Sequence, residues 1–232
     1  MVRHGQASFP AEDYDQLSTL GAEQARRLAL HWVEMKQSFD QVYVGPRRRH
    51  QQTLEAVAGV YREHGLNWPE PVKLPELDEH FGAEVFIRSL PDLMQRDPAL
   101  REKMKQWRKD SDTAHRDFLR LFHKVTRMWV RRELHVPDLE AWHEFRDRVN
   151  RGLTTITNGA GSKKKVVAFS SSGPVAAAMG LALNLDDEAT FELMWTIRNA
   201  AYTEFLFTAG RFSLLASNTV GHLTDPHLLT FI

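Results

Sequence analysis

Apolar residues recur along this 232-residue chain with two different periods. Spacing near 3.6 residues, typical of amphipathic helices, covers residues 20–36, 52–60 and 142–153, and a small-residue helix is predicted over 175–183. Continuous apolar runs typical of strands cover 42–44, 166–169, 202–207 and 212–216. Strands alternating with helices, with a Ser/Gly turn after the run at 166–169, predict a three-layer α/β/α fold.

Residues 87–134 break this alternation, because they show helical spacing and almost no strand signal. We therefore predict a single domain over 1–232 that carries a helical insertion, or lid, at about 87–134. Between Arg96 and Arg132 twelve Lys and Arg residues face five acids, a net charge of +7. The simpler interpretation is a solvated helix face; the alternative is a basic lid that attracts anionic substrates.

Composition excludes several function classes. Lys and Arg number 30 and Asp and Glu also number 30, so overall charge gives no argument for a nucleic-acid or membrane partner. The absence of cysteine excludes disulfide scaffolds, thiol catalysis and thiolate metal sites. The longest apolar run, at 175–183, is far below the roughly 18 residues of a membrane span, and no secretory signal is evident. We expect a cytoplasmic protein.

The first candidate chemistry lies in the tripeptide Arg3-His4-Gly5, which we place at the end of a strand. Ligands of open α/β sheets bind at the carboxyl ends of the strands. An arginine offers planar N–H donors to phosphoryl oxygens, and a neutral imidazole can attack phosphorus near pH 7. The tripeptide therefore suits phosphate chemistry, although alone it is a weak signal.

Two later segments strengthen this interpretation. Residues 17–25 read L-S-T-L-G-A-E-Q-A, and residues 45–53, after a strand, read G-P-R-R-R-H-Q-Q-T. With R-H-G, this order resembles the histidine phosphatase superfamily, or phosphoglycerate-mutase-like family, whose motifs are R-H-G, L-[ST]-x-x-G-x-x-Q-A and S-P-L-x-R-A-x-Q-T. The resemblance implies a mostly parallel, mixed sheet, and it extends to Leu77-Asp78-Glu79, the helix 142–153, the strand 166–169 and residues 218–223.

Family roles can be assigned residue by residue. The resemblance implies that His4 is the nucleophile, that Arg3 and Arg49 clamp the phosphate, and that Glu79 protonates the leaving oxygen. Three other acids lie near Glu79 and leave the proton donor open: Glu76, Asp78 and Glu84. We interpret His50 and His80 as ordinary polar neighbours. No metal and no cofactor are expected.

The chain departs from the family after the strand 166–169. The family has S-H-G-G there, whereas this chain has Ser170-Ser171-Ser172-Gly173, so Ser171 takes the position of the second histidine. Loss of one such donor typically costs about 10²–10³ in rate. We favour phosphate binding by Ser171, Ser172 and the start of the following helix, a turn similar to that of a bacterial branch of the family. Alternatively, His222 or His80 supplies the contact, or the enzyme is weakened.

The start of the chain is the second departure, because only Met1 and Val2 precede Arg3. The first strand is therefore predicted to be too short to reach across the sheet. A true N-terminus upstream of Met1, or an internal methionine taken as the start, would account for this.

We expect a phosphomonoesterase that forms phosphohistidine and acts on a small phosphorylated substrate. A phosphoglycerate mutase is one alternative, and an impaired module that binds phosphorylated ligands is another. Nucleic acid is an unlikely partner, because the insertion's aromatics follow core spacing: Trp107, Phe118, Phe122 and Trp129. The substrate and the oligomeric state stay open; residues 202–207 are expected to form an edge strand that could pair between subunits.

Overall fold

The computed structural model describes residues 1–7, 15–105, 112–208 and 210–231. Two compact units are present. One consists of Met1–Glu79 together with Arg146–Ile232, and the other of His80–Phe145. The first unit holds the sheet and the candidate site.

Six strands form one sheet in the order β3-β2-β4-β1-β5-β6. β1, β2, β3 and β4 are parallel, whereas β5 and β6 are antiparallel to their neighbours. Their bounds are β1 Val2–Arg3, β2 Gln41–Val44, β3 Pro71–Lys73, β4 Val166–Ser170, β5 Tyr202–Thr208 and β6 Arg211–Thr219. The prediction of an α/β fold with a mostly parallel, mixed sheet is confirmed.

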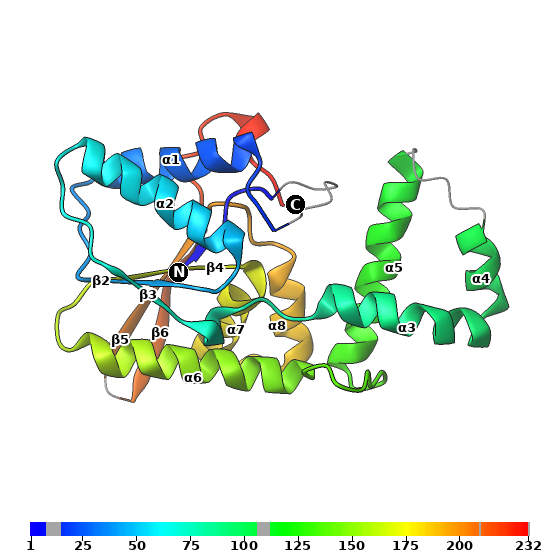
Figure 1. Ribbon diagram of the computed structural model, residues 1–232. Helices are drawn as coiled ribbons and strands as arrows, with labels where there is room; N and C mark the ends of the chain where they lie inside the picture. The colour runs from blue at the N-terminus through cyan, green and yellow to red at the C-terminus, as the bar shows by residue number, and fades with distance from the viewer. Residues whose placement is uncertain (8–14, 106–111, 209, 232) are drawn as a thin grey trace. The chain divides into compact units, whose positions relative to one another are not determined.

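Helices cover both faces of this sheet (Figure 1). On one face α1 (Thr19–Glu34) and α2 (Arg48–Glu63) bury their apolar side against β2 and β4, in a core that includes Leu28, Val57 and Phe169. On the other face lie α6 (Trp142–Ala160), α7 (Ser172–Leu183) and α8 (Asp187–Met194). Every helix and strand predicted for this unit is present. β3 and α8 were not predicted, because a three-residue strand and an eight-residue, half-polar helix give little periodic signal.

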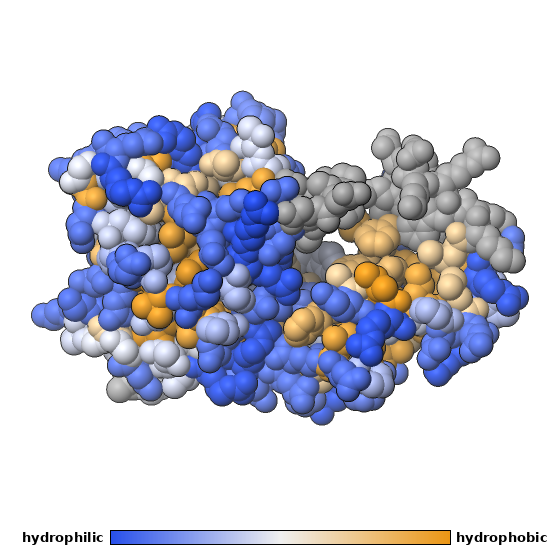
Figure 2. All heavy atoms as spheres, in the orientation of Figure 1, coloured by the Kyte–Doolittle hydropathy of each residue, from blue (hydrophilic) through white to orange (hydrophobic). Residues whose placement is uncertain are grey.

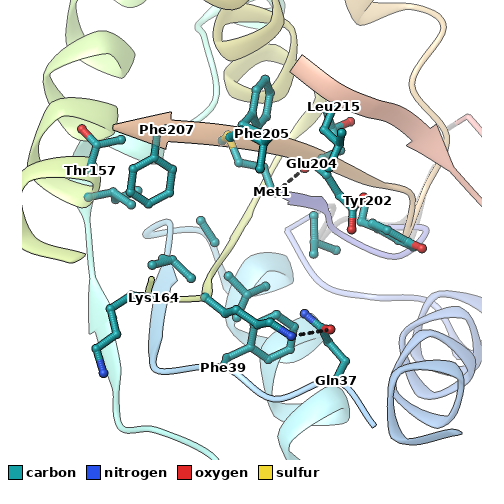
Figure 3. A pocket seen from close by; sticks show the side chains of 18 of the residues that line it. Met1, Gln37, Phe39, Thr157, Lys164, Tyr202, Glu204, Phe205, Phe207 and Leu215 are labelled. Carbon is teal, nitrogen blue, oxygen red and sulfur yellow. Dashed lines mark hydrogen bonds between the residues drawn. The ribbon is translucent and has the colours of Figure 1, made fainter. Parts of the chain in front are cut away.

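β1 has only two residues, as its sequence predicts. The amino group of Met1 donates to the carbonyl of Thr203 at 2.7 Å, which ties the chain start to β5. Beyond Met1, a groove opens between β4 and β5 (Figure 3). Rings such as Phe39, Phe205 and Phe207 line it, at the end of the sheet opposite His4.

The prediction that residues 202–207 form an edge strand is wrong. β5 lies between β1 and β6, and Val2 pairs with Tyr202. The edges are β3 and β6 instead. The pairing of Val2 with Tyr202 joins residues 200 positions apart, which a local sequence pattern cannot indicate.

The second unit contains α3 (Gly82–Arg96), α4 (Pro98–Lys105) and α5 (Asp112–Val130), and it includes the described part of the predicted insertion 87–134. Phe86 of α3 packs on Phe118 and Phe122 of α5, with ring centroids 5.5 and 5.4 Å apart. Apolar side chains also gather on the visible face of this unit (Figure 2). Trp107, Arg108 and Lys109 lie outside the described residues.

Within the described part of the chain, no helix combines the length and the apolar character that crossing a membrane requires.

Candidate active site

His4 directly follows β1, at the carboxyl end of the parallel strands. Its backbone N–H donates to the carbonyl of Ser170 at 2.8 Å, and its carbonyl accepts from the N–H of Ala200 at 3.1 Å. The side chain is only 3% exposed. The imidazole therefore has a fixed position at the edge of the sheet where ligands of such folds bind.

Two contacts determine which nitrogen of His4 carries the proton. Nδ1 lies 2.6 Å from the carbonyl oxygen of Gly5, which can only accept, so Nδ1 is the protonated nitrogen. Nε2 lies 3.1 Å from Nε of Arg49, which can only donate, so Nε2 presents its lone pair. The nucleophilic nitrogen therefore faces the arginine.

The electrostatic environment keeps this ring uncharged. Burial lowers the pKa of His4 well below its usual value, and the nearby charges of Arg49 and Arg3 lower it further. A neutral imidazole is the reactive form for attack on phosphorus.

Arg49 is held by the first turn of α2. Its Nη1 pairs with Asp15 at 2.8 Å, and its Nη2 lies 3.5 Å from the hydroxyl of Ser171. Thr53, one turn later, donates from Oγ1 to the carbonyl of Arg49 at 2.7 Å and accepts from the N–H of Gly5 at 3.2 Å. The threonine thus fixes the helix that carries Arg49 to the loop that carries His4.

Gly5 and Gly21 allow this loop to lie directly on α1. A Cβ on Gly5 would come within 2.2 Å of the carbonyl oxygen of Gly21, and one on Gly21 within 2.1 Å of the carbonyl oxygen of Gln6. The side chain of Ser18 caps α1 by accepting from the N–H of Gly21 at 3.0 Å. Glycine is required at both positions because the two backbones touch.

Arg3 is buried beside His4, but its guanidinium donates to main-chain carbonyls. Nη1 donates to Ile197 and Nη2 to Phe231, the latter at 2.5 Å. After burial and the charge of Arg49, the charge of Arg3 also lowers the pKa of His4. The phosphate-clamping role of Arg3 stays a prediction.

Glu79 reaches the start of α7. Its Oε2 accepts from the N–H of Gly173 at 3.5 Å. Arg148 holds the backbone here by donating to the carbonyls of Asp78 at 3.0 Å and Glu79 at 3.4 Å. Asp78, a competing candidate, is instead paired with Arg47 at 2.5 Å. The geometry favours Glu79 as the acid at this edge, and its role stays a prediction.

Ser171 and Ser172 begin α7. Ser171 is the N-cap and is fully buried, and Ser172 is the first helical residue. The first N–H groups of a helix have no partner within the helix and attract anions. Of the alternative donors, His222 stacks on His31 and Tyr202, with ring centroids 6.1 and 6.2 Å apart.

His50 is the site residue that the sequence interpretation missed. Its Nε2 lies 2.6 Å from the hydroxyl of Ser171, and its ring centroid lies 5.8 Å from that of His4. The signal was the motif itself, because His50 stands where the family has alanine.

The family model of the histidine phosphatase superfamily (branch 1) matches residues 1–113 and 82–220. The chain belongs to this superfamily. Its members include phosphatases and mutases, so membership supports phosphoryl transfer. Among curated protein sequences, none matches the chain significantly.

Solved structures share the fold at low identity. Phosphoserine phosphatase from Entamoeba histolytica, in complex with 3-phosphoglyceric acid, is 16% identical over 96% of each chain, with a TM-score of 0.61. Phosphoglycerate mutase from Bacillus anthracis is 14% identical over 96% of this chain and 92% of its own, with a TM-score of 0.61. Alpha-ribazole phosphatase from Shigella flexneri is 19% identical over 94% of each chain, with a TM-score of 0.57. Phosphatases and a mutase match equally well, so the likeness establishes the superfamily fold alone.

Proposed function

We propose that the protein is a phosphomonoesterase that acts on a small phosphorylated substrate through a phosphohistidine on His4. The observation that carries this proposal is the state of the His4 ring. Its Nε2 keeps its lone pair and lies 3.1 Å from the guanidinium of Arg49. The nucleophilic nitrogen of His4 and the anion-binding guanidinium of Arg49 are therefore in contact.

The reaction has two steps. First, Nε2 of His4 attacks phosphorus, the bond from phosphorus to the ester oxygen breaks, and the carboxyl of Glu79 gives its proton to that oxygen. Then a water molecule attacks the phosphorus, the bond from phosphorus to Nε2 of His4 breaks, and the carboxylate of Glu79 takes a proton from the water. The products are an alcohol and inorganic phosphate, and both His4 and Glu79 return to their starting forms.

Positive charge at the site stabilises the transferring group. When the substrate binds, Arg49 redirects its donors from Nε2 of His4 to the phosphoryl oxygens. Ser171, Ser172 and the N–H groups at the start of α7 supply further donors, and Arg3 contributes its charge. The net basic charge between Arg96 and Arg132 would attract anionic substrates.

The test is turnover of p-nitrophenyl phosphate by wild type and His4→Ala. Wild type should release phosphate, and the variant should lose at least about 10³-fold in kcat/KM because no nucleophile replaces the imidazole. Conversion of 3- to 2-phosphoglycerate without net phosphate release would identify a mutase. Phosphate binding without any turnover would identify an impaired binding module. Full turnover by His4→Ala would refute the role of His4.

A further inference from the structure

Three departures from the family motifs meet at one place in the structure. The family's S-P-L-x-R-A-x-Q-T has serine where this chain has Gly45 and alanine where it has His50, and its S-H-G-G has histidine where this chain has Ser171. These residues come from the end of β2, the first turn of α2 and the N-cap of α7. Compared with the family motifs, this chain lacks the histidine at the N-cap of α7 and has an additional histidine in the first turn of α2.

The new histidine and the serine touch. Nε2 of His50 lies 2.6 Å from Oγ of Ser171, and both residues are fully buried. His4 lies beside this pair, with its ring centroid 5.8 Å from that of His50. Because Oγ of Ser171 already lies at hydrogen-bond distance from the His50 ring, a longer side chain that left Cβ of residue 171 in the same direction would meet that ring.

Gly45 lies against the other side of the His50 ring. A Cβ on Gly45 would lie 2.4 Å from Nδ1 of His50 and 2.8 Å from the carbonyl oxygen of Leu77, closer than packed atoms approach. The family's serine at this position would therefore collide with the His50 ring. The three departures are therefore in contact: the His50 ring lies between the backbone of Gly45 and the hydroxyl of Ser171.

The buried His50 ring is uncharged. Burial lowers its pKa well below the usual value, and the charges of Arg49 and Arg47 lower it further. A neutral imidazole carries one N–H, and the backbone hydrogen bond with Gly45, which raises the pKa of His50, favours the N–H on Nδ1 while no ligand is bound. A phosphoryl oxygen beside Ser171 has no proton to give, so it selects the form in which the hydroxyl donates outward.

We propose that His50 and Ser171 together replace the second histidine of the family. With the phosphoryl group bound, Nε2 of His50 and Nη2 of Arg49 both donate to Oγ of Ser171. The hydroxyl of Ser171 then donates its own proton to an oxygen of the phosphoryl group that is transferred to His4. Ser171 is then a catalytic residue and His50 a positioning residue. This inference rests on the proposed phosphatase function.

The experiment compares His50→Gln with His50→Met, which match the ring in length. Glutamine keeps an N–H donor, whereas methionine has none. We expect kcat of the methionine variant to fall about tenfold or more, the worth of one hydrogen bond to the reacting complex, and that of the glutamine variant to fall clearly less. The control is His64→Met at the other end of α2, which should match wild type because His64 is exposed there. Thermal unfolding of each variant shows that the fold is kept.

A double-mutant cycle tests the pairing. Ser171→Ala should lose about 10² in kcat, and adding His50→Met should cost no more, because His50 acts only through the hydroxyl. Moving the imidazole back by His50→Ala and Ser171→His together, with Gly45 kept, should recover activity that His50→Ala alone loses. Additive losses, or equal losses in the Gln and Met variants, would overturn the inference.

The same variants are titrated with orthovanadate, a phosphate mimic, so that the outcome does not depend on turnover alone. Wild type should bind it more tightly than His50→Met or Ser171→Ala. If wild type hydrolyses ester and binds vanadate but the two variants match it, this inference fails and the phosphatase function stands. If wild type does neither, both fail.

Discussion

Two contacts of the His4 imidazole decide what the ring can do. The carbonyl of Gly5 holds the proton on Nδ1, and Arg49 keeps a donor on Nε2. The same guanidinium is paired with Asp15 at 2.8 Å, so it is positioned before any ligand arrives. Arg3 carries the same charge but is anchored on two carbonyls, those of Ile197 and Phe231.

This difference between the two arginines predicts different losses. Arg49→Ala should reduce kcat by about 10²–10³, because it removes the donor nearest the transferring group, with little change in stability. Arg3→Ala should reduce kcat too, and it should in addition lower the free energy of unfolding by about 1–3 kcal/mol. The reason is that the carbonyls of Ile197 and Phe231 lose their donor. Steady-state kinetics and urea unfolding of both variants measure this. Equal effects on stability would contradict the assignment.

At the scale of elements, the site lies where the end of β1 and the first turns of α2 and α7 come together. The resemblance of the motifs on β1 and α2 to those of the superfamily indicated His4 and Arg49, because each motif is a local stretch of sequence. The contact of His50 with Ser171 spans 121 positions, so no local pattern could show it. Ser171 was identified as a departure, whereas its contact with His50 was not.

The contact between α1 and the His4 loop yields a prediction for Gly21. Gly21→Ala should destabilise the protein by about 1–3 kcal/mol and reduce kcat, because its Cβ would lie 2.1 Å from the carbonyl oxygen of Gln6. Gly59→Ala in α2 is the matched control: the nearest atom to its Cβ is 4.0 Å away, so better helix propensity should leave it neutral or up to about 1 kcal/mol more stable. Similar behaviour of the two variants in thermal unfolding would rule out the close contact.

For the whole molecule the net charge is zero, so the electrostatic field at the site comes from charged groups near it. The sequence indicated the sheet, its two helical layers and an irregular helical segment, because these depend on periodicity over many residues. It could not indicate that β5 lies inside the sheet, since strand order depends on pairings between distant segments. The role of residues 87–134 as a lid stays a prediction.

Buried neutral histidines should make the protein sensitive to acid. Burial, followed by the nearby His31, lowers the pKa of His222 to about 4, below the unfolded value of about 6.5. Below pH 6.5 the unfolded chain binds the proton more readily, so the free energy of unfolding falls as the pH drops from 6.5 towards 4. For His222 alone the loss is about 3 kcal/mol. His4 and His50 add losses of the same sign.

Urea unfolding of wild type and His222→Phe between pH 7.5 and 4.5 measures this contribution. The phenylalanine keeps the ring stacked on His31 and Tyr202 and removes the titration. The variant should therefore lose less stability on acidification than wild type. Parallel curves would show that His222 does not titrate as its burial implies.

The most direct measurement of the central claim is the phosphoprotein itself. Wild type mixed with a ³²P-labelled phosphomonoester and quenched in alkali should carry label that is stable in base and released by acid, as expected of a phosphoramidate on His4. His4→Ala should carry none, and Arg49→Ala should carry less at the same quench time. Undiminished label on the His4→Ala variant, or turnover by wild type with no labelled protein at any quench time, would contradict the account.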